Sequence, residues 1–269
     1  MTVEYVGKGG SGNEAVIDVE IRDEFPGMGK IIGIKQSIQT AHRKPIVYSE
    51  EKVLHEFLRH TVAKKLEDYF FMTGRYKTAH IPRPMGITDQ GYLYEWVPGK
   101  SGFQWAIEEK EERIISLVPA DWDNFSQLFR DAGIDMSYET GYSENLLGCS
   151  DNIVHKFYDG RGRFATQKLK YWKRIDFGLD SLVMDYEKIH DYVMQRQDEM
   201  VDAITLGRFW LLKYAIEFLI EGNEMDPEKM GELEEGIFDF RLSTLDHLDA
   251  RGIGIEHERC EMFASKHDS

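Results

Sequence analysis

The spacing of apolar and polar residues divides the first hundred residues into short strands around one helix. Residues 14–21 alternate apolar and polar side chains, as a half-buried strand does. A turn cluster with one proline and two glycines follows, and residues 30–37 form the next strand, so the pair predicts an antiparallel hairpin. Residues 49–66 carry apolar side chains at helical spacing, and residues 87–97 read as two short strands around a Gln-Gly turn.

The helix predicted over residues 49–66 has recognisable signals at its start. Ser49 suits the capping position, and Glu50 and Glu51 suit a first turn, where the helix dipole favours negative charge. Its apolar stripe consists of Val53, Leu54, Phe57 and Leu58.

Beyond residue 120 the pattern is mainly helical. Residues 121–133 begin at Asp121, a candidate cap, and end at Gly133. One face of this helix is apolar and consists of Trp122, Phe125, Leu128 and Phe129. Further helical patterns cover residues 182–202, 206–221 and 227–248, and a strand-rich island covers residues 152–160 and 162–176.

This order of elements predicts two parts of different architecture. Residues 1–97 form an antiparallel sheet with one inserted helix, and residues 98–269 form a mainly helical part with an inserted β-hairpin. Residues 97–102 (VPGKSG) read as the linker. We therefore expect an α+β fold with two lobes.

Charge argues against one class of partner. The net charge of −15 over 269 residues disfavours a nucleic-acid-binding face, which needs clustered Lys and Arg. The densest basic stretch consists of Lys168, Lys170, Lys173 and Arg174. We interpret it as a solvated strand edge, with a binding patch as the alternative.

Compartment signals are few. Cys149 and Cys260 support neither a disulfide framework nor a zinc site, and the first residues show no secretory pattern. The longest apolar stretch, residues 206–220, is too short for a bilayer span and reads as a buried helix. We expect no membrane partner and a cytoplasmic location.

Candidate phosphate chemistry begins near the N-terminus. Glycines at 7, 9 and 12 allow backbone N–H groups to approach phosphate oxygens closely, although by themselves they are explained more simply by a flexible N-terminal turn. Lys35 lies within an apolar strand, where an ammonium needs an acid or a phosphate. Glu50 is the candidate acid, Glu51 is the second choice, and a position on the solvent face of an edge strand is the alternative for the lysine.

Six segments stand in an order that resembles the protein-kinase-like superfamily, including its aminoglycoside-phosphotransferase-like and atypical branches. They are G7-x-G9-x-x-G12, GIKQ, EEKVL, IPRPMG, YLYEWVPG and IDFG, and together they extend over residues 7–178. No motif is decisive alone, but six in register are hard to obtain by chance. No phosphorylated activation segment is evident after IDFG, which favours the small-molecule or atypical branches.

The resemblance implies ATP and Mg²⁺ as cofactors and assigns roles to named residues. Lys35 binds the α- and β-phosphates, Glu50 orients Lys35, and Asp176 binds the Mg²⁺ that bridges the phosphates. The loop over the phosphates consists of Gly7, Gly9, Gly10 and Gly12, and the adenine is held by backbone groups of Glu95 and Val97.

The catalytic loop departs from the family pattern, which places an aspartate base five residues before an asparagine metal ligand. Asn145 is the first choice for that ligand and Asn152 is its rival, but Thr140 stands five residues before Asn145. Asp135 and Glu139 are the nearby acids that can serve as the base from a longer loop.

These observations lead to two functional hypotheses. The first is an ATP- and Mg²⁺-dependent phosphotransferase acting on a hydroxyl of a small molecule or a protein, with an unknown phosphate acceptor. The second is a pseudokinase that binds nucleotide or a partner without turnover. An α+β protein unrelated to kinases is the third interpretation.

Overall fold

The computed structural model has an α+β fold, as the sequence predicts. It describes residues 3–8, 13–18, 32–37, 50–88, 91–95, 100–101, 117–119, 121–136, 146–148, 153–158, 164–169, 172–174, 177–178 and 182–249. Its contacts divide the chain into two units, Met1–Val62, Arg83–Trp96 and Thr205–Ser269 in the first and Ala63–Pro82 and Val97–Ile204 in the second. Trp96 and Val97 fall in different units, as do Val62 and Ala63, and the residues from Thr205 onwards are grouped with the first unit.

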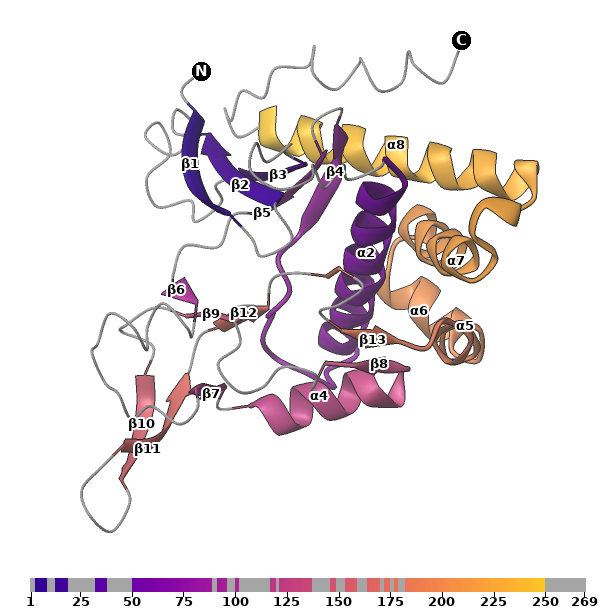
Figure 1. Cartoon of the computed structure of the whole chain (residues 1–269). Helices are drawn as coiled ribbons and strands as arrows, with labels where there is room; N and C mark the ends of the chain where they lie inside the picture. The colour runs from indigo at the N-terminus through magenta and orange to yellow at the C-terminus, as the bar shows by residue number, and fades with distance from the viewer. Residues whose placement is uncertain are drawn as a thin grey trace. The chain divides into compact units, whose positions relative to one another are not determined.

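The first unit contains a five-stranded antiparallel sheet in the order β1-β2-β3-β5-β4 (Figure 1). Its strands are β1 (Val3–Lys8), β2 (Asn13–Asp18), β3 (Ile32–Ser37), β4 (Pro84–Thr88) and β5 (Gly91–Glu95). The hairpin of β2 and β3 and the strands β4 and β5 are confirmed. Strand β1 was not predicted, so the glycine-rich segment joins two paired strands instead of preceding them.

Lys35 belongs to an interior strand of this sheet. Its Cα is in register with Ala15 of β2 on one side and with Tyr92 of β5 on the other. The alternative that placed Lys35 on an edge strand is therefore wrong, because β3 has a hydrogen-bonded neighbour on both sides.

Helix α2 (Glu50–Met72) confirms the predicted helix and continues six residues beyond it. The extension follows because Tyr69 and Phe70 are buried and continue the packing, and the chain turns only at Gly74, whose φ is +71°. Phe57 and Leu58 are fully buried, whereas Val53 and Leu54 are only half-buried. Ser49, the predicted cap, lies outside the described residues.

Two further helices complete the described part of the first unit. α7 (Leu206–Glu221) is followed by a short 3₁₀ turn, η3 (Gly222–Glu224), and by α8 (Pro227–Asp249). Pro227 opens α8, where its missing N–H costs no helical hydrogen bond. α7 packs on α8, and α8 runs beside β4 (Figure 1).

The strands of the second unit form small sheets. β12 (Trp172–Arg174), β9 (Leu146–Gly148) and β6 (Lys100–Ser101) pair in that order. A second sheet has the order β10-β11-β7 and consists of β10 (Ile153–Tyr158), β11 (Phe164–Leu169) and β7 (Leu117–Pro119). The predicted strand-rich island is confirmed.

Helix α4 (Trp122–Asp131) confirms the prediction for residues 121–133, except for the role of its cap. Asp121 occupies the capping position but makes no side-chain capping hydrogen bond. Its carboxylate instead accepts a hydrogen bond from the Tyr76 hydroxyl and lies 2.9 Å from Nε2 of His80. The Asp121 carboxylate thus binds Tyr76 and His80, which are distant in the chain, and not the backbone N–H groups at the start of α4. The hydroxyl's burial, followed by its bond to Asp121, raises the pKa of Tyr76.

The helix predicted over residues 182–202 is wrong at its start and its middle. Val183–Met184 form a strand, β13, and the helical part divides into α5 (Tyr186–Met194) and α6 (Gln197–Ala203). α5 begins where it does because Asp185 caps it, with Oδ1 accepting the N–H of Lys188 at 3.0 Å. Within the described ranges, no helix is long and apolar enough to cross a membrane.

Candidate functional site around Asp135

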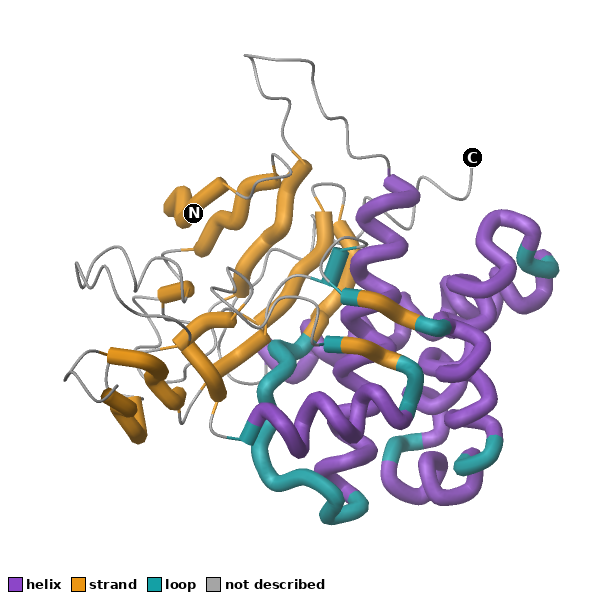
Figure 2. Tube along the Cα trace, turned by 60° about the horizontal axis from the view of Figure 1, so that its bottom comes forward, coloured by secondary structure: helices purple, strands orange, loops and turns teal. Residues whose placement is uncertain are grey.

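Asp135 lies on a short strand that follows helix α4. This strand, β8 (Ile134–Asp135), pairs antiparallel with β13, with Asp135 opposite Val183 and Ile134 opposite Met184. Figure 2 shows the two short strands side by side against the helices of this unit. Asp135 is thereby paired with the segment that follows the predicted Asp-Phe-Gly motif.

The alternation along β8 separates the acid from the core. Ile134 and Met136 are fully buried, whereas Asp135 between them is half-buried. Successive side chains of a strand point to opposite faces, so the carboxylate lies on the face away from the packed interior. A half-buried carboxylate on a rigid strand has the chemistry of a general base or a metal ligand.

Gly133 permits the sharp change from α4 to β8. Its φ of +96° is a conformation that residues with a β-carbon rarely adopt, and its N–H donates to the Arg130 carbonyl at 3.1 Å. Its own carbonyl accepts the N–H of Asp185 at 2.9 Å, next to β13. This hydrogen bond therefore joins the residue before β8 to the residue after β13.

Arg174, the last residue of β12, connects the strand before the predicted Asp-Phe-Gly motif to the residue that follows Asp135. Its main-chain N–H donates to the His80 carbonyl at 2.8 Å, and its guanidinium donates to the Met136 carbonyl at 3.4 Å. Met136 directly follows Asp135, and Arg174 stands two residues before Asp176. The interpretation of Arg174 as part of a solvated basic stretch is wrong, since its side chain is 0% exposed.

The connection between α2 and β4, which includes His80, is anchored by a buried acid. Glu67 accepts the N–H groups of His80 and Ile81, the latter at 2.9 Å, and the ammonium of Lys64 at 2.6 Å. Burial lowers the pKa of Lys64, but the charges of Glu67 and Asp68 outweigh it, so that the net pKa is raised. This anchor holds the main chain to which Arg174 is bonded.

The remaining predicted residues are described only in part. Gly7 lies in β1 and Lys35 in β3, Glu50 is the first residue of α2, and Glu95 is the last residue of β5. The other candidates lie outside the described residues: Gly9, Gly10, Gly12, Val97, Glu139, Asn145, Asn152 and Asp176. The structure therefore describes the strand of Asp135 with its burial and its pairing, and the strand of Lys35 through its pairing with β2 and β5.

Gly133 was predicted only as the end of a helix and Arg174 only as part of a basic stretch, so neither role at this site was predicted. A buried arginine leaves no signal in the period of apolar residues, because an arginine counts as a polar position.

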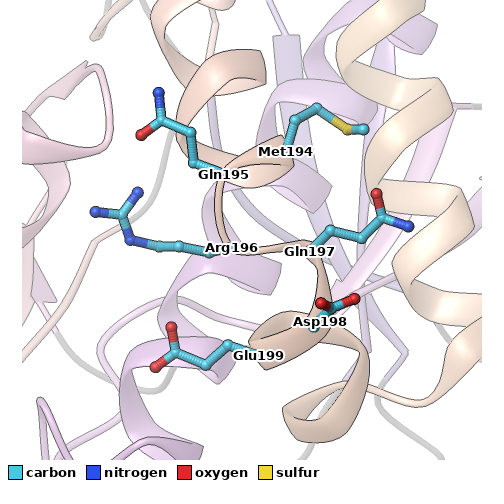
Figure 3. A pocket seen from close by; sticks show the side chains of 6 residues that line it. All are labelled: Met194, Gln195, Arg196, Gln197, Asp198 and Glu199. Carbon is cyan, nitrogen blue, oxygen red and sulfur yellow. The ribbon is translucent and has the colours of Figure 1, made fainter.

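A hollow near the start of α6 is a weaker candidate (Figure 3). Its volume is about 370 Å³ and it is lined by the consecutive residues Met194–Glu199. Its charged side chains have partners, since Arg196 lies 3.8 Å from the centre of the Tyr192 ring and Glu199 accepts from Tyr69 and Arg75. Two of its charged side chains are therefore engaged within the protein, which makes the hollow a weaker candidate than the surroundings of Asp135.

The described side chains contain no group of three metal-ligating residues. The two metal ligands that the resemblance implies, Asn145 and Asp176, are not among these side chains. Their carboxylate and amide oxygens are the donors that Mg²⁺ prefers.

Comparison with family models, curated proteins and solved structures finds no significant match for this chain.

Proposed function

We propose that this protein is an ATP- and Mg²⁺-dependent phosphotransferase of the protein-kinase-like type. The acceptor is a hydroxyl of a small molecule or a protein. The cytoplasmic location expected from the sequence stays part of this proposal.

The observation that carries the proposal is the placement of Asp135 between the segments before and after the predicted Asp-Phe-Gly motif. β13, after the motif, pairs with β8, and β12, before the motif, reaches Met136 through Arg174. A metal-binding motif and a catalytic base have to act on the same phosphoryl group, so their segments need to be neighbours. Glu139 lies outside the described residues, and we assign the base to Asp135, whose strand is described.

The first unit supports the proposal through its strand order. In chain order, the hairpin β1–β2 surrounds the glycine-rich segment, β3 carries Lys35, and α2 follows with Glu50 at its start. This is the succession of phosphate-covering loop, lysine strand and glutamate helix that kinase-like enzymes require. Glu95 ends β5, where the chain leaves the sheet towards the expected linker.

The proposed chemistry is in-line transfer of the γ-phosphoryl group. The hydroxyl oxygen of the acceptor bonds to the γ-phosphorus, and Asp135 accepts the proton of that hydroxyl. The bond between the γ-phosphorus and the bridging oxygen breaks, and ADP leaves with that oxygen. Lys35 neutralises charge on the α- and β-phosphates. Asp176 and Asn145 would hold Mg²⁺, which would supply further charge neutralisation. The loose transition state gains most from such neutralisation, so the base contributes less than the positioning.

The test combines calorimetry with ATP and Mg²⁺ and incubation with radiolabelled ATP and candidate acceptors. We expect Mg²⁺-dependent ATP binding that is lost in Asp176→Asn. Asp135→Asn is expected to retain binding and to lower the transfer rate by about 10²–10⁴-fold. Asp191→Asn removes an exposed acid on α5 and is the matched control, expected to behave as the parent.

Two outcomes would overturn the proposal in different ways. ATP binding without turnover above the Asp176→Asn background would identify a pseudokinase. Absence of any Mg²⁺-dependent ATP binding would leave an α+β protein unrelated to kinases.

A further inference from the structure

Arg174 is the largest fully buried side chain in the described part of the protein, and it is charged. Removing a guanidinium from water costs several kcal/mol unless its hydrogen-bonding groups are satisfied by the surrounding structure. An apolar side chain of similar volume fills such a position at a lower cost. The arginine at this position therefore calls for a role that a hydrophobic residue does not supply.

The bonds of Arg174 join three segments of the second unit. Its main chain binds the His80 carbonyl, which belongs to the connection anchored by Glu67. Its guanidinium binds the Met136 carbonyl at the end of β8. Arg174 itself ends β12. The side chain thus links the residue that follows β8 to the last residue of β12.

We propose that Arg174 is a positioning residue that holds the main chain after Asp135 at a fixed distance from the strand leading to Asp176. This inference rests on the proposed function, in which those two acids act on one phosphoryl group. Arginine suits the task because its planar guanidinium reaches a backbone carbonyl in a fixed direction from a rigid strand. Methionine fills much of the same space but donates no hydrogen bond.

A merely structural role and a positioning role predict different results for Arg174→Met. A structural role predicts a change in stability with unchanged catalytic constants per folded molecule. A positioning role predicts a folded protein with a lower kcat, because a misplacement of about 1 Å can cost about 10²-fold in rate. ATP affinity is expected to change little, since Arg174 is assigned no contact with the nucleotide.

The experiment compares the parent, Arg174→Met and Arg174→Lys. Urea unfolding, Mg²⁺-ATP calorimetry and steady-state transfer kinetics are measured on each full-length protein. For Arg174→Met we expect a folded protein of lower stability, because the buried Met136 carbonyl loses its donor, and a kcat per folded molecule lowered by about 10²-fold with KM little changed. Arg174→Lys keeps a donor in a different direction and is expected to restore only part of the rate. Arg208→Met, an exposed arginine on α7, is the matched control.

Hydrogen exchange provides a readout that does not depend on turnover. In Arg174→Met the amides of β8, β12 and β13 are expected to exchange faster, while those of α7 and α8 keep their parental rates. Parental exchange in those three strands would overturn the inference, even if the parent proves inactive. A folded Arg174→Met with parental kcat would overturn it in an active enzyme. If Arg174→Met does not fold, the same two measurements on Arg174→Lys decide.

Discussion

Gly133 and Ile189 approach each other so closely that a β-carbon on Gly133 would lie 3.0 Å from Cγ1 of Ile189. It would also lie 3.1 Å from the Asp185 carbonyl oxygen, and the φ of +96° is unfavourable for any residue except glycine. The glycine lets α5 pack directly against the turn that delivers Asp135.

Gly133→Ala is expected to lower the free energy of unfolding by about 2–4 kcal/mol, from backbone strain together with overpacking. Urea unfolding measures this change. The matched control is Gly231→Ala in α8, where a β-carbon meets no atom within 4 Å. That control is expected to stabilise the protein by about 0.5–1 kcal/mol. A Gly133→Ala protein as stable as the parent would show that this turn tolerates a β-carbon.

Glu67→Gln is expected to lower the free energy of unfolding by about 3–5 kcal/mol. The substitution removes the negative charge that pairs with the buried Lys64. Both oxygens of Glu67 accept hydrogen bonds, and in glutamine an NH₂ group replaces one of them and faces a donor. Chemical denaturation checks the value. Asp68→Asn is the control, because Asp68 pairs with Lys64 at 3.1 Å but its side chain is 36% exposed. Its expected cost is at most about 1 kcal/mol, and an equal cost for both variants would contradict the anchoring role of Glu67.

Stability is expected to fall below about pH 6.5 partly through His55. Burial lowers the pKa of His55, Arg59 lowers it further, and Glu51 opposes them. Its ring centre lies 5.5 Å from that of Phe218. Because the pKa is lower in the folded state, the contribution is complete above the unfolded-state value and is lost as pH falls through the folded-state value.

The measurement for His55 is the melting temperature at pH 7.5 and at pH 5.5. The drop is expected to be smaller in His55→Gln than in the parent. Equal drops in the parent and in His55→Gln would mean that this histidine contributes nothing to the acid sensitivity.

Lys35→Met is expected to weaken Mg²⁺-ATP binding by at least about tenfold, the loss that corresponds to about 1.4 kcal/mol. The physical reason is the removal of the ammonium proposed to bind the phosphates from an interior strand of the sheet. Calorimetry measures affinity, and thermal melting confirms that the variant folds. Lys77→Met, at an exposed position between α2 and β4, should bind as the parent does. Parental affinity in Lys35→Met would remove the phosphate role of this lysine.

The secondary structure was predictable where one period ran through a whole segment. The hairpin of β2 and β3 and the helix α4 were found because alternation and helical spacing depend only on which faces are buried. The start of α5 was missed because a two-residue strand such as β13 carries too few residues for a period. Its existence depends on β8, which lies far away in the chain.

The chain by itself determined the α+β composition, the hairpin of β2 and β3 and the lysine strand. These follow from the secondary-structure propensities of the residues and from the spacing of apolar positions, both of which can be read from neighbouring residues in the sequence. The tertiary structure alone decided that Arg174 is buried, that Asp121 serves Tyr76 and His80 and not its own helix, and that Asp135 lies beside β13. Each of these depends on a partner more than 35 positions away in the chain. Hydrogen bonds between distant segments produce no regular spacing of residues, so the sequence pattern does not reveal them.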